Sequence, residues 1–211
     1  MAGKKIRKGI AKALSFLMPK WQPRIEDWPK KTIVIGAPHT SNFDALLMVL
    51  IMWQAEREFN FLVKDEVMKV PVLKSLVRWL GGIPVNRRQS TGLTHNLAQV
   101  IQQSDTFTLC ITPKGTRSKQ EYWKSGFYRI AYENKLPITF GLVDSVTKTY
   151  GTGPTFEPTW NVADDMEKIR AFYKDMLGYN PEQSSTPRLR AEDDAKAAEY
   201  LLRPVTDEPM S

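Results

Sequence analysis

Short apolar segments alternate with longer amphipathic segments along the chain, and this alternation predicts strands separated by helices. The apolar runs at residues 32–35, 59–63, 106–111 and 137–143 have the length and composition of buried strands. Between them, helices are predicted to begin near residues 41, 65, 91 and 125, and a last helix is capped by Asn161 or Asp164. A Gly-Thr-Gly-Pro turn at 151–154 closes a further strand pair. The sequence therefore predicts a single α/β domain whose mixed β-sheet is covered by helices on both faces.

The N-terminal segment has the period of an amphipathic helix from Lys4 to Met18, which Pro19 ends. Its apolar stripe comprises Ile6, Ile10, Ala13, Leu14 and Leu17, and the opposite side carries Lys4, Lys5, Lys8 and Lys12. The amphipathic ring of Trp21 follows the helix. Such a helix either lies in the headgroup region of an anionic membrane or packs its apolar face on its own domain. The helix alone favours neither interpretation.

The excess positive charge belongs to this end of the chain. Residues 1–31 contain nine Lys or Arg and two acidic residues, which accounts for the whole net charge of +7. The balanced remainder argues against a nucleic-acid-binding fold, in which basic residues line a groove. We divide the chain into a basic amphipathic helix at 1–21, a globular domain at 30–178 and a polar tail at 180–211. We expect this tail to be mobile, with at most one weak helix near Ala191–Leu202.

The longest uninterrupted apolar stretch, Ala45–Trp53, has nine residues and is too short to span a bilayer. It is apolar on all sides, so we expect a helix buried between layers. The N-terminus lacks an apolar core followed by a cleavage site, so we expect the protein in the cytosol or peripherally on the cytoplasmic face of the cell membrane. The single cysteine, Cys110, lies in an apolar run and is expected to be a small core residue.

The strongest candidates for chemistry are His39 and Asp44, in the sequence His-Thr-Ser-Asn-Phe-Asp. The histidine falls in a strand-to-helix loop, and the aspartate falls in the first turn of the helix. Folding of this loop would let one ring nitrogen of His39 donate to Asp44 while the other faces an open site. A carboxylate there also makes the imidazole a stronger base. The alternative is that Asp44 only stabilises the helix N-terminus.

Two further blocks have the composition of anion-binding loops. Gly-Ile-Pro-Val at 82–85 leads to Arg87 and Arg88, whose guanidinium groups suit a phosphate. The loop Pro113–Ser118 follows a buried strand, and its Gly115 lets backbone amides approach an anion beside a hydroxyl and a guanidinium group. Alone, the arginine block is better explained as a solvent-facing pair at a strand end, and the loop is equally well explained as a polar surface loop.

Taken in order, the three blocks resemble the glycerophospholipid acyltransferase superfamily, whose familiar members are lysophosphatidic acid acyltransferases. His39 and Asp44 match its His-x4-Asp motif, and Gly82 to Arg87 matches its second motif. Its third motif, Pro-Glu-Gly-Thr-Arg-Ser, is matched by Pro113–Ser118 except at Lys114, and its fourth is matched loosely by residues 136–138. The resemblance runs from about residue 30 to 178, and segments 64–88 and 123–128 look like a compact bacterial branch of the family.

The resemblance implies an O-acyltransferase that moves a fatty acyl group from an acyl thioester to the hydroxyl of a lysophospholipid such as 1-acylglycerol 3-phosphate. The thioester carrier would be coenzyme A or acyl carrier protein, with no metal and no other cofactor. His39, oriented by Asp44, would be the general base. The residues implied in binding the acceptor phosphate are Arg87, Arg117, Lys114, Gly115 and Thr116. The residues then expected to bind an anionic membrane are Lys4, Lys5, Ile6, Lys8, Ile10, Leu14, Leu17 and Trp21.

Lys114 is the main departure from the family, which has glutamate at this position. The reversed charge leaves three outcomes open: an acceptor with more negative charge, a weakened enzyme, or a lipid-binding protein of the membrane surface that has lost turnover. Because His39 and Asp44 are retained, we favour the changed acceptor.

Overall fold

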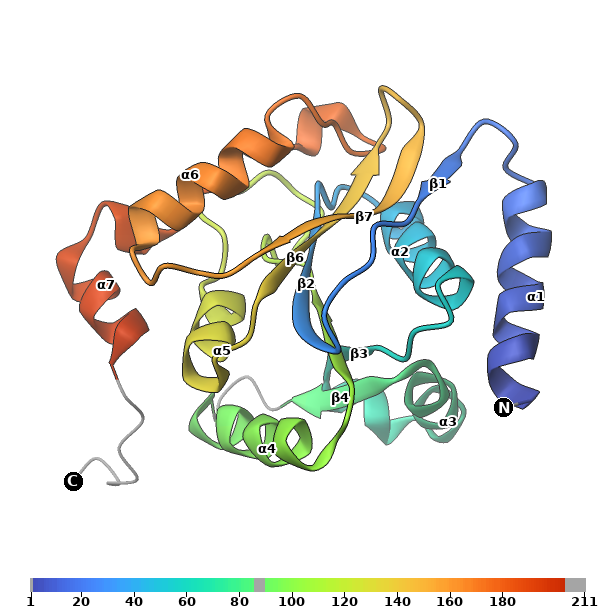
Figure 1. The fold of residues 1–211 in the computed structure, drawn as a ribbon, viewed down its shortest axis with the longest axis horizontal. Coiled ribbons are helices and arrows are strands. Elements are labelled where there is room, and N and C mark those ends of the chain that lie inside the picture. Colours follow the sequence, from blue (N-terminus) through green and yellow to red (C-terminus); the bar gives the residue numbers. More distant parts are fainter. Residues whose placement is uncertain (1, 86–89, 204–211) are drawn as a thin grey trace.

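A computed structural model describes residues 2–85 and 90–203, and its centre is a seven-stranded sheet (Figure 1). The strand order is β1-β7-β6-β2-β5-β3-β4. The strands are β1 (Gln22–Arg24), β2 (Lys31–Ala37), β3 (Asn60–Lys64), β4 (Gly82–Val85), β5 (Phe107–Ile111), β6 (Ile138–Asp144) and β7 (Thr149–Phe156). Strands β6 and β7 pair antiparallel, and the other neighbours in this sheet pair in parallel. The predicted α/β domain with a mixed sheet is confirmed.

Helices cover both faces of this sheet. The helices are α1 (Ala2–Phe16), α2 (Asn42–Gln54), α3 (Pro71–Leu80), α4 (Ser90–Gln103), α5 (Gly126–Asn134), α6 (Val162–Tyr173) and α7 (Ala195–Leu202). Side chains of α1, α2 and α3 pack in one core, and those of α4 to α7 pack in the other. Alternate residues of β2 serve the two cores, because Ile33 and Ile35 lie with α5 and α6, and Val34 lies with α2.

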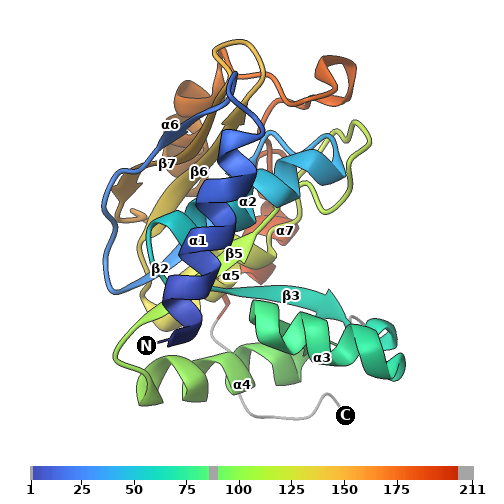
Figure 2. The ribbon, with the colours of Figure 1, turned by 90° about the vertical axis from the view of Figure 1, so that its right-hand side faces the viewer.

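Helix α2 lies between the sheet and α1, which crosses in front of it in Figure 2. Most of its apolar side chains are covered there, although Leu46 is 41% exposed. Leu47, Leu50 and Ile51 are fully buried there, as predicted. In the part of the chain that the structure describes, no helix is both long enough and apolar enough to cross a membrane.

Helix α1 packs on the domain with a face that includes Leu14 but not the rest of its predicted apolar stripe. Ala11 is fully buried, and Leu14 and Trp21 are half-buried against the core of α2. Ile6, Ile10 and Leu17 remain 59%, 39% and 73% exposed. The predicted amphipathic helix is therefore present, with an unburied apolar face.

The domain also engages part of the basic face of α1. Lys4 pairs with Glu58 at 3.4 Å, and Lys8 pairs with Glu56. Of the residues expected at a membrane, Lys4 and Lys8 make these solvent-exposed ion pairs, and Leu14 and Trp21 pack on the domain. Lys5, Ile6 and Ile10 of α1, and Leu17 directly after it, are exposed. Their contact with a membrane stays a prediction.

The polar C-terminal segment folds back onto the domain, so the expectation of a mobile tail is wrong for residues 181–202. Two 3₁₀ turns, Pro181–Gln183 and Arg190–Glu192, precede α7. Leu189 and Leu201 are buried in the core of α5 and α6. The composition of this segment is misleading because only a few apolar side chains are needed to dock it. Residues 204–211 lie outside the described range.

Candidate active site

The loops carrying the first and third motifs lie at the same edge of the sheet. His39 follows β2, and Pro113–Ser118 follows β5. These two strands are parallel neighbours, with Ile35 opposite Ile111, so their carboxyl ends meet. Open α/β sheets bind their ligands at this edge.

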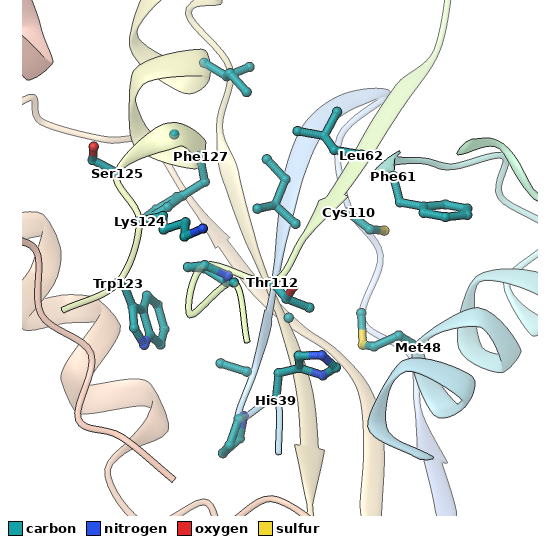
Figure 3. Close-up of a pocket in the computed structure, with 18 of the residues that line it drawn as sticks. His39, Met48, Phe61, Leu62, Cys110, Thr112, Trp123, Lys124, Ser125 and Phe127 are labelled. Carbon is teal, nitrogen blue, oxygen red and sulfur yellow. The ribbon is translucent and has the colours of Figure 1, made fainter. Parts of the chain in front are cut away.

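A cavity of about 970 Å³ opens between these loops, and its lining is mostly apolar (Figure 3). One wall includes Met48, Phe61 and Cys110, and the other includes Trp123 and Phe127, with His39 between them. The cavity reaches both faces of the sheet. This is possible because β3 pairs with β5 only at two positions, which leaves the ends of the two strands apart.

Cys110 belongs to the cavity wall and is chemically inert there. Burial raises the pKa of its thiol to about 12, so the thiolate that a nucleophile requires is not formed near neutral pH. It was predicted as a core residue, and it is in fact half-buried, packing against the core of α2 while also lining the cavity.

His39 is half-buried, and its ring lies in the cavity (Figure 3). Burial lowers the pKa of His39, the charge of Asp44 opposes this shift, and Arg117 and Lys114 add to it. The net pKa is below the ordinary value of 6.5, so the imidazole is neutral at pH 7. A neutral imidazole beside an open site has the protonation state of a general base.

Asp44 does not make the predicted hydrogen bond to His39. Its Oδ2 accepts from the amides of Thr40 (2.5 Å) and Ser41 (2.7 Å), and its Oδ1 accepts from the Tyr179 amide (3.4 Å). The Ser41 hydroxyl accepts from the Asp44 amide in return, which completes a capping box at the start of α2. The carboxylate is thus occupied by nearer donors, and it acts on His39 through its charge.

Lys114 is turned away from the cavity and is only 5% exposed. Its ammonium group donates to the carbonyl oxygens of Arg117 (3.0 Å) and Gln183 (2.6 Å). Burial lowers the pKa of Lys114, and Asp44 opposes that shift. The predicted contact of Lys114 with phosphate is therefore wrong, because this side chain ties the third-motif loop to the C-terminal segment. The reversed charge then gives no reason to expect a changed acceptor or a loss of turnover.

The other residues expected to bind phosphate differ in whether they line the cavity. Gly115 and Arg117 line the cavity, and Arg117 also donates to Asn42 Oδ1. The hydroxyl of Thr116 accepts from the Ser118 amide at 3.4 Å, and Thr116 is not part of the lining. Arg87 lies outside the described residues, so its contact with phosphate stays a prediction.

Sequence reasoning missed two features of the site. Lys124 lines the cavity, and its amide donates to the carbonyl oxygen of Pro113 at 2.8 Å. Residues 178–180 brace the His39 loop, since the Asn180 amide donates to Thr40 Oγ1 at 3.0 Å and its side chain donates to the Thr40 carbonyl at 3.1 Å. The lysine directly before a predicted helix was a visible signal, whereas no local pattern connects residue 180 with residue 40.

The chain is similar to known proteins in sequence and in fold. The family model described as Acyltransferase matches residues 22–141. The "Probable 1-acyl-sn-glycerol-3-phosphate acyltransferase" of Mycoplasma pneumoniae is 30% identical over 121 residues, which is 54% of this chain and 44% of that protein. The match therefore spans less than half the length of this relative. The structure of the 1-acyl-sn-glycerophosphate (LPA) acyltransferase PlsC from Thermotoga maritima shares the fold, with a TM-score of 0.52 and 18% identity over 79% of this chain and 76% of that one.

Proposed function

Because the chain belongs to the Acyltransferase family, whose model covers more than half of it, we propose that it transfers a fatty acyl group from an acyl thioester to the hydroxyl of a lysophospholipid. The acceptor is of the 1-acylglycerol 3-phosphate type, in line with the names of its relatives. Coenzyme A or acyl carrier protein carries the thioester. The observation that carries the proposal is the position of His39, which shares one mostly apolar cavity with Arg117.

In this mechanism, the neutral imidazole of His39 removes the proton from the acceptor hydroxyl while the hydroxyl oxygen attacks the carbonyl carbon of the thioester. The carbonyl oxygen gains negative charge in the tetrahedral intermediate. When the intermediate collapses, the C–S bond breaks and the thiolate takes the proton from the imidazolium. The products are the ester and a free thiol, and His39 is neutral again. Asp44 favours the imidazolium through its charge.

The cavity suits substrates of this kind because it combines a long apolar lining with cations near the base. The apolar walls hold acyl chains, which are stabilised by about 0.8 kcal/mol per buried CH₂ group. Arg117 lies close enough to His39 to lower its pKa, so an acceptor phosphate bound there brings its hydroxyl near the base.

The central experiment measures thiol release and ester formation with palmitoyl-coenzyme A and lysophosphatidate. Removal of a general base slows such reactions roughly 10²- to 10⁴-fold, so His39→Ala should lose activity by that factor. Thiol release without acceptor corrects for hydrolysis. Equal rates of ester formation in the two proteins would reject His39 as the base.

We also propose that the protein works on the surface of an anionic membrane, on its cytoplasmic face. Support comes from the exposed residues Ile6 and Ile10 of α1, from Leu17 directly after it, and from the amphipathic helix α3, where Val72 and Leu76 are exposed. Both helices lie on the side of the molecule that faces the viewer in Figure 2. Helix α3 follows β3 through the 3₁₀ helix Asp65–Lys69, which begins at the carboxyl end of β3, the edge of the sheet where the cavity opens.

A further inference from the structure

Lys124 lies in the cavity wall, and hydrogen bonds hold its backbone in place. Its amide donates to Pro113, and the preceding Trp123 amide donates to the Arg188 carbonyl at 2.7 Å. The Trp123 ring is buried and meets the rings of Phe127 and Tyr173 edge-on. The backbone at Lys124 is therefore held between the third-motif loop and the C-terminal segment.

The Lys124 side chain lies directly over Gly115. A Cβ atom at residue 115 would lie 2.8 Å from Cε, 2.9 Å from Cδ and 3.3 Å from Nζ of this lysine. Gly115 also has a φ of +70°, a backbone conformation that favours glycine. The glycine of the third motif thus leaves the space through which Lys124 extends. In Figure 3 the lysine lies on the wall of Trp123 and Phe127, opposite Met48.

The charges that line the cavity favour an anionic ligand. Arg117, Lys124 and Arg190 are cations, and Asp44 is the acidic residue of the lining. The Asp44 carboxylate is already engaged by backbone amides. Among residues 2–85 and 90–203, Lys124 has no acidic partner within 4.0 Å. Lys124 is also exposed to solvent, so its charge is partly screened by water but is accessible to an anion that enters the cavity.

We propose that Lys124 binds the phosphate of the acceptor, together with Arg117, and supplies the contact that Lys114 does not make. The inference rests on the proposed function and adds a residue that determines acceptor specificity. Arg117 is directed toward α2 through Asn42, whereas Lys124 lies on the wall that leads into α5. A phosphomonoester on the third-motif loop would meet one cation from each side.

The test compares Lys124→Met and Lys124→Arg with Lys119→Met, an exposed lysine of the same loop that does not line the cavity. Each protein is assayed with lysophosphatidate and with monoacylglycerol, which lacks the phosphate. Hydrogen bonds to charged groups contribute about 1.5–3 kcal/mol, so Lys124→Met should raise the KM for lysophosphatidate roughly 10- to 100-fold. We expect kcat, the KM for acyl-coenzyme A and the activity on monoacylglycerol to stay within a few-fold. Lys124→Arg should recover part of the loss, and Lys119→Met should match the wild type.

Three results would overturn the inference. One is a higher KM for acyl-coenzyme A in Lys124→Met, which would assign the lysine to the phosphates of the donor. The others are an equal loss with both acceptors and no loss with either, each of which would leave Lys124 without a role in recognising phosphate.

The inference can also be separated from the proposed function by measuring binding without turnover. Calorimetry with a soluble short-chain lysophosphatidate requires no acyl transfer. A Kd that is at least tenfold higher in Lys124→Met than in wild type and in Lys119→Met supports the phosphate contact, even in a protein that shows no activity. Equal Kd values would reject it, even in an active enzyme.

Discussion

At the scale of single residues, the charges around His39 determine the pH at which it can act as a base. Burial, Arg117 and Lys114 lower the pKa of His39, and Asp44 raises it. A general base must be unprotonated, so kcat/KM should increase with pH through a pKa below 6.5 and then level off. The site should therefore be fully active at neutral pH.

Asp44→Asn tests whether the carboxylate acts through its charge. The amide oxygen can still accept from the amides of Thr40 and Ser41, so the capping box is retained in part. Loss of the negative charge removes the influence that raises the pKa of His39, so the acidic limb of the kcat/KM profile should move to lower pH. We expect the maximal rate to fall as well, because the imidazolium loses its stabilising neighbour. An acidic limb that stays in place or moves to higher pH would contradict this role.

Lys114 provides a second prediction at this scale, concerning stability. Lys114→Met removes the donor to two carbonyl oxygens, and this should lower the free energy of unfolding by about 1–3 kcal/mol. Lys114→Glu restores the family residue but sets a carboxylate against the same carbonyl oxygens, so it should destabilise at least as much and should not increase the rate. Denaturant titration measures both changes, with Lys119→Glu as the exposed control. A Lys114→Glu protein of unchanged stability and higher activity on lysophosphatidate would show that the lysine is not structural.

At the scale of elements, sequence patterns predicted those helices and strands that bury a regularly spaced set of apolar side chains. The run at 32–35 marked β2, and the apolar stretch at 45–53 marked the enclosed helix α2. Strand β1 escaped prediction because its three residues are all exposed and it is held mainly by pairing with β7. The motifs likewise identified His39 and Arg117, which do line the cavity. They could not reveal that Lys114 bonds to Gln183, since that contact joins segments far apart in the sequence.

The loop at 178–180 is the element whose importance for the site only the structure reveals. A Cβ at Gly178 would lie 2.4 Å from Thr40 Oγ1 and 2.5 Å from its Cγ2. Gly178→Ala should therefore displace Thr40 together with its neighbour His39, and a shift of about 1 Å at a reacting group can cost roughly 100-fold in rate. We expect kcat to fall by 10- to 100-fold, with about 1–3 kcal/mol of stability lost through overpacking.

Two comparisons sharpen this prediction. Thr40→Ala removes the two nearest atoms, so the double variant Gly178→Ala/Thr40→Ala should be more active than Gly178→Ala alone if steric displacement is the cause. Gly9→Ala places a methyl group in open space and should not lower the unfolding temperature. A Gly178→Ala protein with normal kcat would show that this loop does not position the His39 segment.

At the scale of the whole molecule, the exposed apolar faces of α1 and α3 give the protein a side suited to a bilayer. Removing residues 1–21 is a poor test of this idea. Ala11 and Leu14 pack with the core of α2, so truncation would also uncover part of that core. Substitutions of exposed side chains leave that packing intact and change only the outer surface.

We therefore predict vesicle binding and test it with two sets of substitutions. The α1 set is Ile6→Ser/Ile10→Ser/Leu17→Ser, in which Leu17 directly follows the helix, and the α3 set is Val72→Ser/Leu76→Ser. The wild type should sediment with vesicles containing anionic lipid, and less so at high salt, because basic residues near the surface contribute about 1 kcal/mol each. Each set removes apolar area that a bilayer would bury, at about 25 cal/mol per Å², so each should weaken binding at least tenfold. Val100→Ser, at a similarly exposed position on α4, should bind like the wild type.

The two sets also distinguish how the molecule sits on the membrane. If both weaken binding, the bilayer contacts α1 and α3 together, and α3 brings the carboxyl edge of the sheet next to the lipid. An acyl chain could then pass from the bilayer into the cavity without crossing water, and the α3 variant should lose activity on vesicle-bound lysophosphatidate while keeping it on a short-chain, soluble acceptor. If only the α1 set weakens binding, the protein is tethered by one helix, and the cavity must take its acceptor from solution. Unchanged binding in both variants would reject this side of the molecule as the membrane surface.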